Sequence, residues 1–153
     1  MVSVKLEHLR EEDVRLLVRH PDPERRASAA QRICRTVRTV QLSEDERTFA
    51  HKLLAYMAED AVAIVRRALS VTLQNSPELP RNVAKKLALD IDNIAVPILT
   101  FSPVLTDDDL VEVLRSKAAS KVMAIARRAS VSGNVVREIV RYGDSRAVAE
   151  VAA

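Results

Sequence analysis

The chain has 153 residues, of which 48% are hydrophobic and 29% are charged, and its 24 basic and 21 acidic residues leave a formal net charge of +3. This composition predicts a soluble globular protein and excludes a disordered tail. The only glycines, Gly133 and Gly143, are too few for the tight turns of an all-β fold, so we expect an all-α protein.

The chain also lacks the sequence features of secreted and membrane proteins. Residues 1–7 have neither the basic start nor the apolar run of a secretory signal, and no uncharged stretch approaches the roughly 18 residues of a membrane span. The single cysteine, Cys34, excludes an intramolecular disulfide and favours a reducing compartment. We therefore expect a cytoplasmic protein that does not contact a membrane.

The first 42 residues are predicted to form two divergent helices, because apolar residues recur at spacings of three and four. The first helix covers 11–19 and is predicted to end there because Pro21 and Pro23 follow. The second covers about 27–40, and Cys34 lies on its buried face.

From residue 43 the pattern predicts regular pairs of helices. Ser43 and Glu46 have the spacing of a capping box, and the helix they begin covers 44 to about 59. Asp60 is predicted to cap the following helix. A helix over about 81–89 comes next, and Asp90 then repeats the role of Asp60.

The C-terminal part continues this pattern. The segment 94–99 is apolar on nearly every side and is predicted to be the most buried helix, kinked at or starting near Pro97. Thr106 and the three aspartates after it predict a further helix start. The remaining helices are predicted to include 122–129, to begin near 135 after the break at 132–134, and to cover 147–153.

An internal repeat gives the strongest indication of architecture. Residues 63–68, AIVRRA, recur as AIARRA at 124–129, which is 61 residues later (63 to 124). Segment 94–99 lies halfway, so Val65, Val96 and Ala126 are expected at equivalent places with a period of about thirty. One helix pair of this size cannot bury its apolar face alone and needs neighbours.

We therefore predict a single helical-repeat domain over 1–153, a right-handed α-solenoid of HEAT-like hairpins with nine or ten helices. Residues 1–42 form the divergent helices, and 43–153 form about three and a half repeats. A helical bundle with accidental self-similarity is the alternative.

Two resemblances accompany this prediction. Asp60 to Arg66, an acidic turn followed by Val-Arg, resembles HEAT repeats and the related leucine-rich repeat variant. The stretch 96–110, with Val-Pro-Ile-Leu and then Ser-Pro-Val-Leu-Thr-Asp, resembles an uncharacterised domain family common in alphaproteobacteria, over about 43–153. That family implies no activity. Its members are often longer, which implies that this chain is the N-terminal part of a longer protein and that more chain or a second copy covers the apolar helix 147–153.

No residue pattern predicts an enzyme. Without glycine clusters there is neither a phosphate-binding loop nor a dinucleotide site. His8, His20 and His51 are too scattered for a metal site, and Cys34 lies among apolar residues, where a thiol is unreactive. We predict no catalytic, metal or cofactor residues.

The acidic turn residues Asp60, Asp90 and Asp144 are expected to cap helices and to bridge arginines. The candidate interaction surface consists of two arginine pairs that recur at one repeat position, Arg66 with Arg67 and Arg127 with Arg128. Arg25 and Arg26 would extend it. The first arginine of each recurring pair is expected to bridge an aspartate.

The predicted function is a non-enzymatic protein interaction module or scaffold whose partner is unknown. A homo-oligomer through the apolar C-terminal helix is a variant of this prediction. The alternative is a HEAT-like repeat that binds nucleic acid through a basic arginine face, although the chain has few of the aromatic residues on which single strands stack.

Overall fold

The structure is a computed structural model that describes residues 4–153, and throughout this range the regular structure is helical, with ten α-helices and no strand. The helices are α1 (Glu11–Arg19), α2 (Pro23–Thr39), α3 (Glu44–Ala58), α4 (Ala63–Leu73), α5 (Arg81–Ala88), α6 (Asp92–Phe101), α7 (Asp107–Leu114), α8 (Ala119–Ala126), α9 (Gly133–Tyr142) and α10 (Ser145–Ala152). The predicted all-α class is confirmed.

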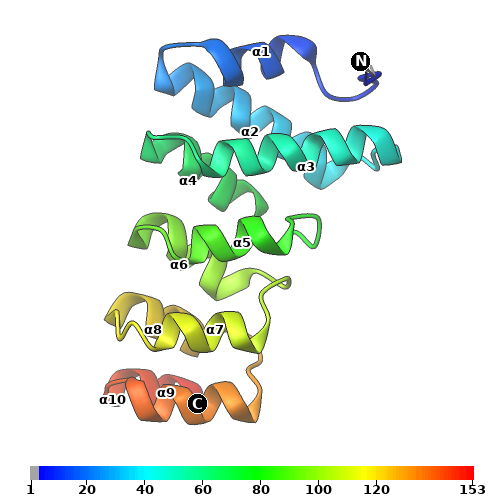
Figure 1. The fold of residues 1–153 in the computed structure, drawn as a ribbon. Coiled ribbons are helices and arrows are strands. Elements are labelled where there is room, and N and C mark those ends of the chain that lie inside the picture. Colours follow the sequence, from blue (N-terminus) through cyan, green and yellow to red (C-terminus); the bar gives the residue numbers. More distant parts are fainter. Residues whose placement is uncertain (1–3) are drawn as a thin grey trace.

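The helices form consecutive pairs that lie one beyond the next, from α1 and α2 at the N-terminal end to α9 and α10 at the C-terminal end (Figure 1). Helices α2, α4, α6, α8 and α10 each pack on the next in this series, and we call them the even layer. Helices α1, α3, α5, α7 and α9 form the odd layer, which lies in front of the even layer over most of Figure 1. Each odd helix packs on its even partner.

One continuous apolar core joins the pairs. The largest fully buried side chains come from almost every pair, from Leu17 on α1 through Leu69 on α4 and Ile98 on α6 to Leu114 on α7. Burial of one such aliphatic side chain contributes about 2 kcal/mol, and all of them belong to one contiguous cluster. Each pair therefore depends on the next for its stability.

Several helix ends follow the local sequence signals. Helix α1 has the predicted bounds, and α7 begins with a complete capping box, in which Thr106 accepts the Asp109 N–H at 3.2 Å and Asp109 accepts the Thr106 N–H at 3.0 Å. Asp144 caps α10 by accepting the Ala147 N–H at 3.0 Å. In each case donor and acceptor lie three residues apart, so the sequence alone identifies them.

One predicted helix start is confirmed with an incomplete capping box, and two predicted N-caps were wrong. Ser43 accepts the N–H of Glu46 at 3.3 Å, but the Glu46 carboxylate binds a distant segment, so the capping box is only half formed. The N-cap of α4 is Val62, and Asp60 accepts the Val62 N–H from two residues upstream. Asp90 likewise accepts the N–H of Ile91, the N-cap of α6. Both aspartates are occupied by arginines of other helices.

The period of thirty was also wrong in the C-terminal half, where α7 and α9 begin 26 residues apart (107 to 133). Val65, Val96 and Ala126 consequently lie at the third residue of α4, the fifth of α6 and the eighth of α8, and are not equivalent. Pro97 lies inside α6, which begins five residues earlier, and its side chain is partly exposed, as is that of Val96. Helix α6 is therefore buried along one side only.

Candidate interaction surface

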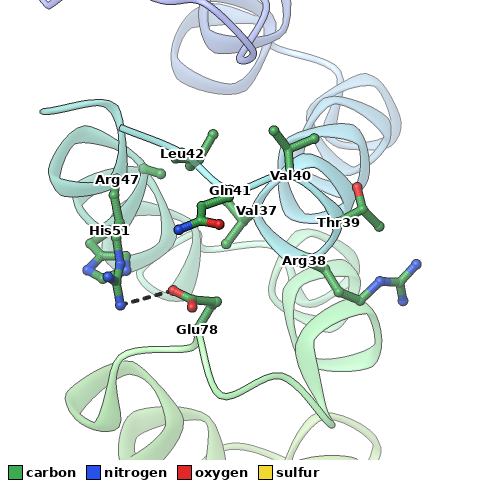
Figure 2. A pocket seen from close by; sticks show the side chains of 10 residues that line it. Val37, Arg38, Thr39, Val40, Gln41, Leu42, Arg47, His51 and Glu78 are labelled. Carbon is green, nitrogen blue, oxygen red and sulfur yellow. Dashed lines mark ion pairs between the residues drawn. The ribbon is translucent and has the colours of Figure 1, made fainter. Parts of the chain in front are cut away.

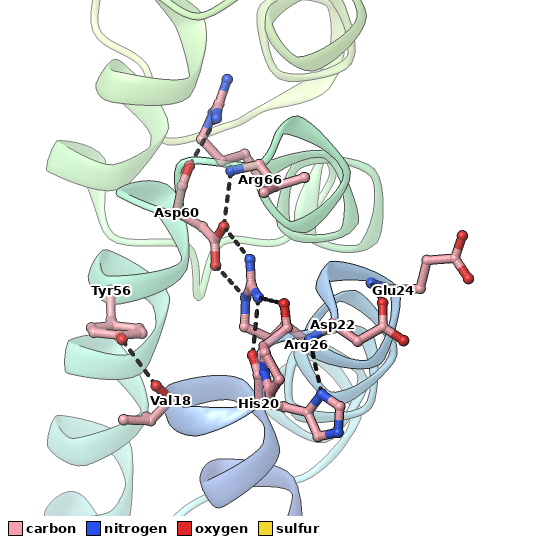
Figure 3. Close-up of polar contacts among 10 residues, drawn as sticks. Val18, His20, Asp22, Glu24, Arg26, Tyr56, Asp60 and Arg66 are labelled. Atoms are coloured by element: carbon pink, nitrogen blue, oxygen red, sulfur yellow. Dashed lines mark hydrogen bonds and ion pairs between the residues drawn. The ribbon is translucent and has the colours of Figure 1, made fainter.

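The first arginine with a structural role is Arg26, the fourth residue of α2. Its Nε and Nη2 donate to the two carboxylate oxygens of Asp60 at 3.0 and 3.2 Å, and its Nη1 donates to the carbonyls of His20 and Pro21, both at 3.0 Å (Figure 3). Burial raises the pKa of Asp60, but the bonds from Arg26 and the Val62 N–H outweigh it and hold that pKa below its ordinary value. Both carboxylate oxygens of Asp60 are thus engaged by Arg26.

The next pair of helices repeats the arrangement. Arg66, the fourth residue of α4, donates from Nε and Nη2 to the carboxylate of Asp90 at 2.7 and 3.1 Å, and from Nη1 to the Asp60 carbonyl at 2.8 Å. Figure 3 shows Asp60 between the two arginines, accepting from Arg26 with its side chain and from Arg66 with its backbone. We call Arg26, Asp60, Arg66 and Asp90 the ion-pair chain. It links the first three helix pairs along one edge.

The ion-pair chain ends at α6, because the fourth residues of α6 and α8 are Ala95 and Val122. Arg128, which follows α8, makes a different link. Its Nη1 and Nη2 donate to the carbonyls of Leu99 and Ser102 at 2.8 and 2.7 Å, at the C-terminal end of α6. Burial lowers the pKa of this guanidinium. Arg128 thus stabilises unpaired carbonyls at a helix end.

The four predicted arginines therefore do not form one row. Arg66 and Arg67 lie in the first half of α4, whereas Arg127 is the C-cap of α8 and Arg128 follows it. Helices α4 and α8 begin 56 residues apart (63 to 119), so the 61-residue sequence match is out of register with the structure. The aspartate partner expected for the first arginine of each pair exists for Arg66 but not, within residues 4–153, for Arg127.

Arg67 and Arg127 are exposed and make no salt bridge within the described part of the chain, unlike Arg66, which forms an ion pair. Arg35 and Arg38 on α2 are exposed in the same way, and within residues 4–153 the only side-chain bond of either is a 3.4 Å contact from Arg38 to the Thr72 carbonyl. These guanidinium groups keep their hydrogen-bonding capacity for a ligand.

The two layers differ strongly in charge. The helices of the even layer carry nine basic and three acidic residues, a balance of +6, whereas those of the odd layer carry nine basic and eleven acidic residues, a balance of −2. The odd layer also neutralises its charges internally, for example through Lys85 with Glu112 at 3.0 Å and Arg81 with Asp109 at 2.8 Å. The even helices therefore hold the excess of basic residues, of which Arg25, Arg26, Arg32 and Arg66 are paired with aspartates outside these helices.

A small open cavity of about 390 Å³ lies beside the end of α2, between the segment 39–42 and α3. In the close-up, Arg47 forms an ion pair with Glu78 across its mouth at 3.1 Å, and His51 lies behind Arg47 (Figure 2). Burial lowers the pKa of His51, whose Nε2 has no hydrogen-bond partner among the described residues. Arg47 is neutralised by Glu78, and His51 is the one imidazole in the lining of this cavity. The lining therefore contains no nucleophile paired with a general base.

The remaining candidate groups have structural partners. Nδ1 of His8 lies 2.9 Å from the Glu46 carboxylate, and Nδ1 of His20 accepts the Asp22 N–H at 3.0 Å. Cys34 is fully buried against Met57, and burial raises its pKa. Among residues 4–153, no group of three His, Cys, Asp or Glu side chains could hold a metal ion.

The sequence pattern did not predict that the carboxylate of Glu46 binds a distant backbone segment. Glu46 is 0% exposed, and its Oε2 accepts the backbone N–H groups of Glu7, His8 and Leu9 at 3.1, 2.9 and 2.9 Å. Burial raises its pKa, but these bonds and the contact with the His8 ring outweigh burial and lower it. The donors lie nearly forty residues upstream, so no local pattern indicates them.

In the part of the chain that the structure describes, no helix combines the length and the apolar character needed to cross a membrane.

Residues 94–153 match the model of a family described as an uncharacterised protein conserved in bacteria, DUF2336. This supports the predicted resemblance to an uncharacterised bacterial domain family, over a shorter segment than the expected 43–153. Among curated proteins and solved structures, no significant match was found.

Proposed function

We propose that this chain is a short right-handed α-solenoid of HEAT-like hairpins, and that it acts in the bacterial cytoplasm as a non-enzymatic module that binds another protein. The observation that carries the proposal is the charge difference between the layers, +6 on the even layer and −2 on the odd layer. Four of the nine even-layer cations, Arg25, Arg26, Arg32 and Arg66, form ion pairs with aspartates outside the even helices, whereas the exposed Arg35, Arg38 and Arg67 form none within the described residues. Exposed charge of one sign that lacks an internal partner favours a binding partner of the opposite sign.

The use of the polar groups supports a binding role over catalysis. Four of the buried or half-buried carboxylates, Glu46, Asp60, Asp90 and Asp109, accept hydrogen bonds from arginines or backbone N–H groups, which stabilises their anionic form. A general acid or base needs a pKa near neutral pH and access to substrate. These four groups have lowered pKa values and internal partners.

The test is isolation of the complex. The full chain is expressed with an affinity tag in its own cell, cross-linked and purified, and a captured protein is then produced separately and mixed with the chain. Light scattering should show a complex of fixed stoichiometry. The absence of any such complex, together with turnover of a small molecule by the purified chain, would refute the proposal. A homodimer through α10 remains a prediction that the same light-scattering measurement tests.

Nucleic acid is the second candidate, because the even layer carries an excess of arginine. A salt-dependent mobility shift that is lost in Arg67→Glu with Arg127→Glu would support it. Arg128 is excluded from this test, since its bonds to the Leu99 and Ser102 carbonyls make it part of the fold. An unchanged mobility of duplex and single strands at low salt would eliminate the candidate.

A further inference from the structure

The outer side of the even layer presents one shared face. Each of α4, α6 and α8 packs on the even helices before and after it and on its odd partner, so only one side of each helix is free. On α4 the exposed residues Ile64, Arg67 and Val71 are spaced at i, i+3 and i+7, which places them on a single side. On each of these helices, the two even neighbours and the odd partner cover three sides. The remaining free sides therefore lie next to one another.

Apolar side chains interrupt the charge of this face. Val71 on α4 is 40% exposed and Phe101 at the end of α6 is 53% exposed. The C-terminal ends of the even helices are adjacent, since Arg38 reaches the Thr72 carbonyl from α2 and Arg128 reaches the Ser102 carbonyl from the end of α8. Val71 and Phe101 each precede one of these carbonyl residues, so they lie along the same edge.

Cations flank the apolar residues. Arg35 and Arg38 lie on α2, Arg67 on α4, and Arg127 at the end of α8, all exposed and without a salt bridge among the described residues. From α2 to α8, the even helices contain only two acidic residues, Glu24 and Asp92, and both lie in the first turn of a helix. Beyond their first turns these helices therefore contain no acidic residue that could neutralise Arg35, Arg38 and Arg67.

We propose that this face, consisting of Arg35, Arg38, Arg67, Val71, Phe101 and Arg127, binds an acidic segment of another protein that carries aliphatic or aromatic side chains between its carboxylates. This inference rests on the proposed function and specifies the partner's chemistry. Carboxylates would pair with the guanidinium groups, and the apolar side chains would cover Val71 and Phe101.

The dimensions set the length of the segment. Packed helices lie about 10 Å apart, so α2 to α8 span about 30 Å. An extended chain covers about 3.3 Å per residue, and about ten residues would reach from Arg38 to Arg127. Nucleic acid fits this face less well, because four separated arginines offer few phosphate contacts and the exposed apolar side chains would remain uncovered by a phosphate backbone.

The experiment measures fluorescence anisotropy of a labelled peptide of about twelve residues that alternates Glu and Leu, titrated with the full chain. A peptide that alternates Glu and Ser, and a DNA duplex of equal charge, serve as competing probes. The test variant is Arg67→Glu with Arg127→Glu. The matched control is Lys52→Glu with Arg115→Glu, which makes the same charge change at exposed odd-layer positions that also lack salt bridges among the described residues. Circular dichroism melting establishes that both variants fold.

We expect the Glu-Leu peptide to bind, with an affinity about tenfold weaker in the even-layer variant and within about twofold of the original in the control. Phe101→Ser should weaken binding of the Glu-Leu peptide by about threefold and leave the affinity for the Glu-Ser peptide unchanged. Lack of binding at low salt, an equal loss in both double variants, or tighter binding of the duplex than of the peptide would overturn the assignment. If the cross-linked partner is still retained by the even-layer variant, the interaction function stands and this face is not its site.

Discussion

Replacement of Glu46 by Gln tests whether a buried anion holds the N-terminal segment against α3. The carboxylate is 0% exposed, and its Oε2 accepts three backbone N–H groups, from Glu7, His8 and Leu9, at 2.9 to 3.1 Å. Gln keeps an acceptor oxygen but loses the charge, and charge-assisted hydrogen bonds are roughly twice as strong as neutral ones. With about 0.5 to 1 kcal/mol lost per bond, Glu46→Gln should lower the free energy of unfolding by about 2 kcal/mol.

The pH dependence gives an independent check on the same variant. The folded-state pKa of Glu46 lies below its ordinary value of 4.5, so its contribution to stability is present above that pH and is lost as the pH falls through the folded pKa. The stability difference between the original chain and Glu46→Gln should therefore be largest at neutral pH and shrink in acid, where the protonated carboxyl resembles the amide.

Urea unfolding followed by circular dichroism measures both effects. Glu44→Gln is the matched control, because Glu44 is exposed in the same first turn of α3, and we expect it to change stability by no more than about 0.5 kcal/mol. A loss in Glu46→Gln as small as that of the control, or a difference that does not vary with pH, would refute the role assigned to the anion.

Three further predictions concern the other buried polar groups and the thiol. A double-mutant cycle with Arg66→Ala and Asp90→Ala should give a coupling of about 2 kcal/mol by urea unfolding, because both side chains are largely buried; simple additivity would contradict the ion-pair chain. Asp109→Asn should lower stability by about 1 to 2 kcal/mol at pH 7, since the pKa of this carboxyl is lowered to about 2, and the difference should diminish as the pH falls from about 4 toward 2; a constant difference would exclude the anion as the cause. Cys34 should react with a thiol reagent only after urea unfolds the chain, as burial raises its pKa, and rapid reaction of the folded protein would contradict its placement in the core.

The sequence predicted the helices well because their signals are local. The capping box of Thr106 and Asp109 and the N-cap at Asp144 depend on residues three positions apart, which the sequence displays directly. Periodic apolar residues likewise identified the bounds of α1. Neither feature needs knowledge of a neighbouring helix.

The interaction surface was harder to predict, because it depends on which helices share a layer. The arginine match at 63–68 and 124–129 suggested one row, yet shorter repeats in the C-terminal half shift Arg127 to a helix end. The partner of Arg26 lies 34 residues away, and Arg128 binds carbonyls, which every residue possesses and no side-chain pattern reveals. The charge asymmetry, by contrast, is accessible to sequence reasoning, since a sum of charges over alternate helices needs only the helix order.

The ion-pair chain has a mechanical consequence for the molecule as a whole. Its links join the first three helix pairs and stop at α6, and the turn before α8 carries Lys117 where the earlier turns carry Asp60 and Asp90. Thermal opening should therefore begin at the C-terminal end, where α9 and α10 separate at the lowest cost, and proceed toward the N-terminus. Amide hydrogens in α9 should accordingly exchange with solvent faster than those in α4. The N-terminal half of the molecule would then be the more rigid half.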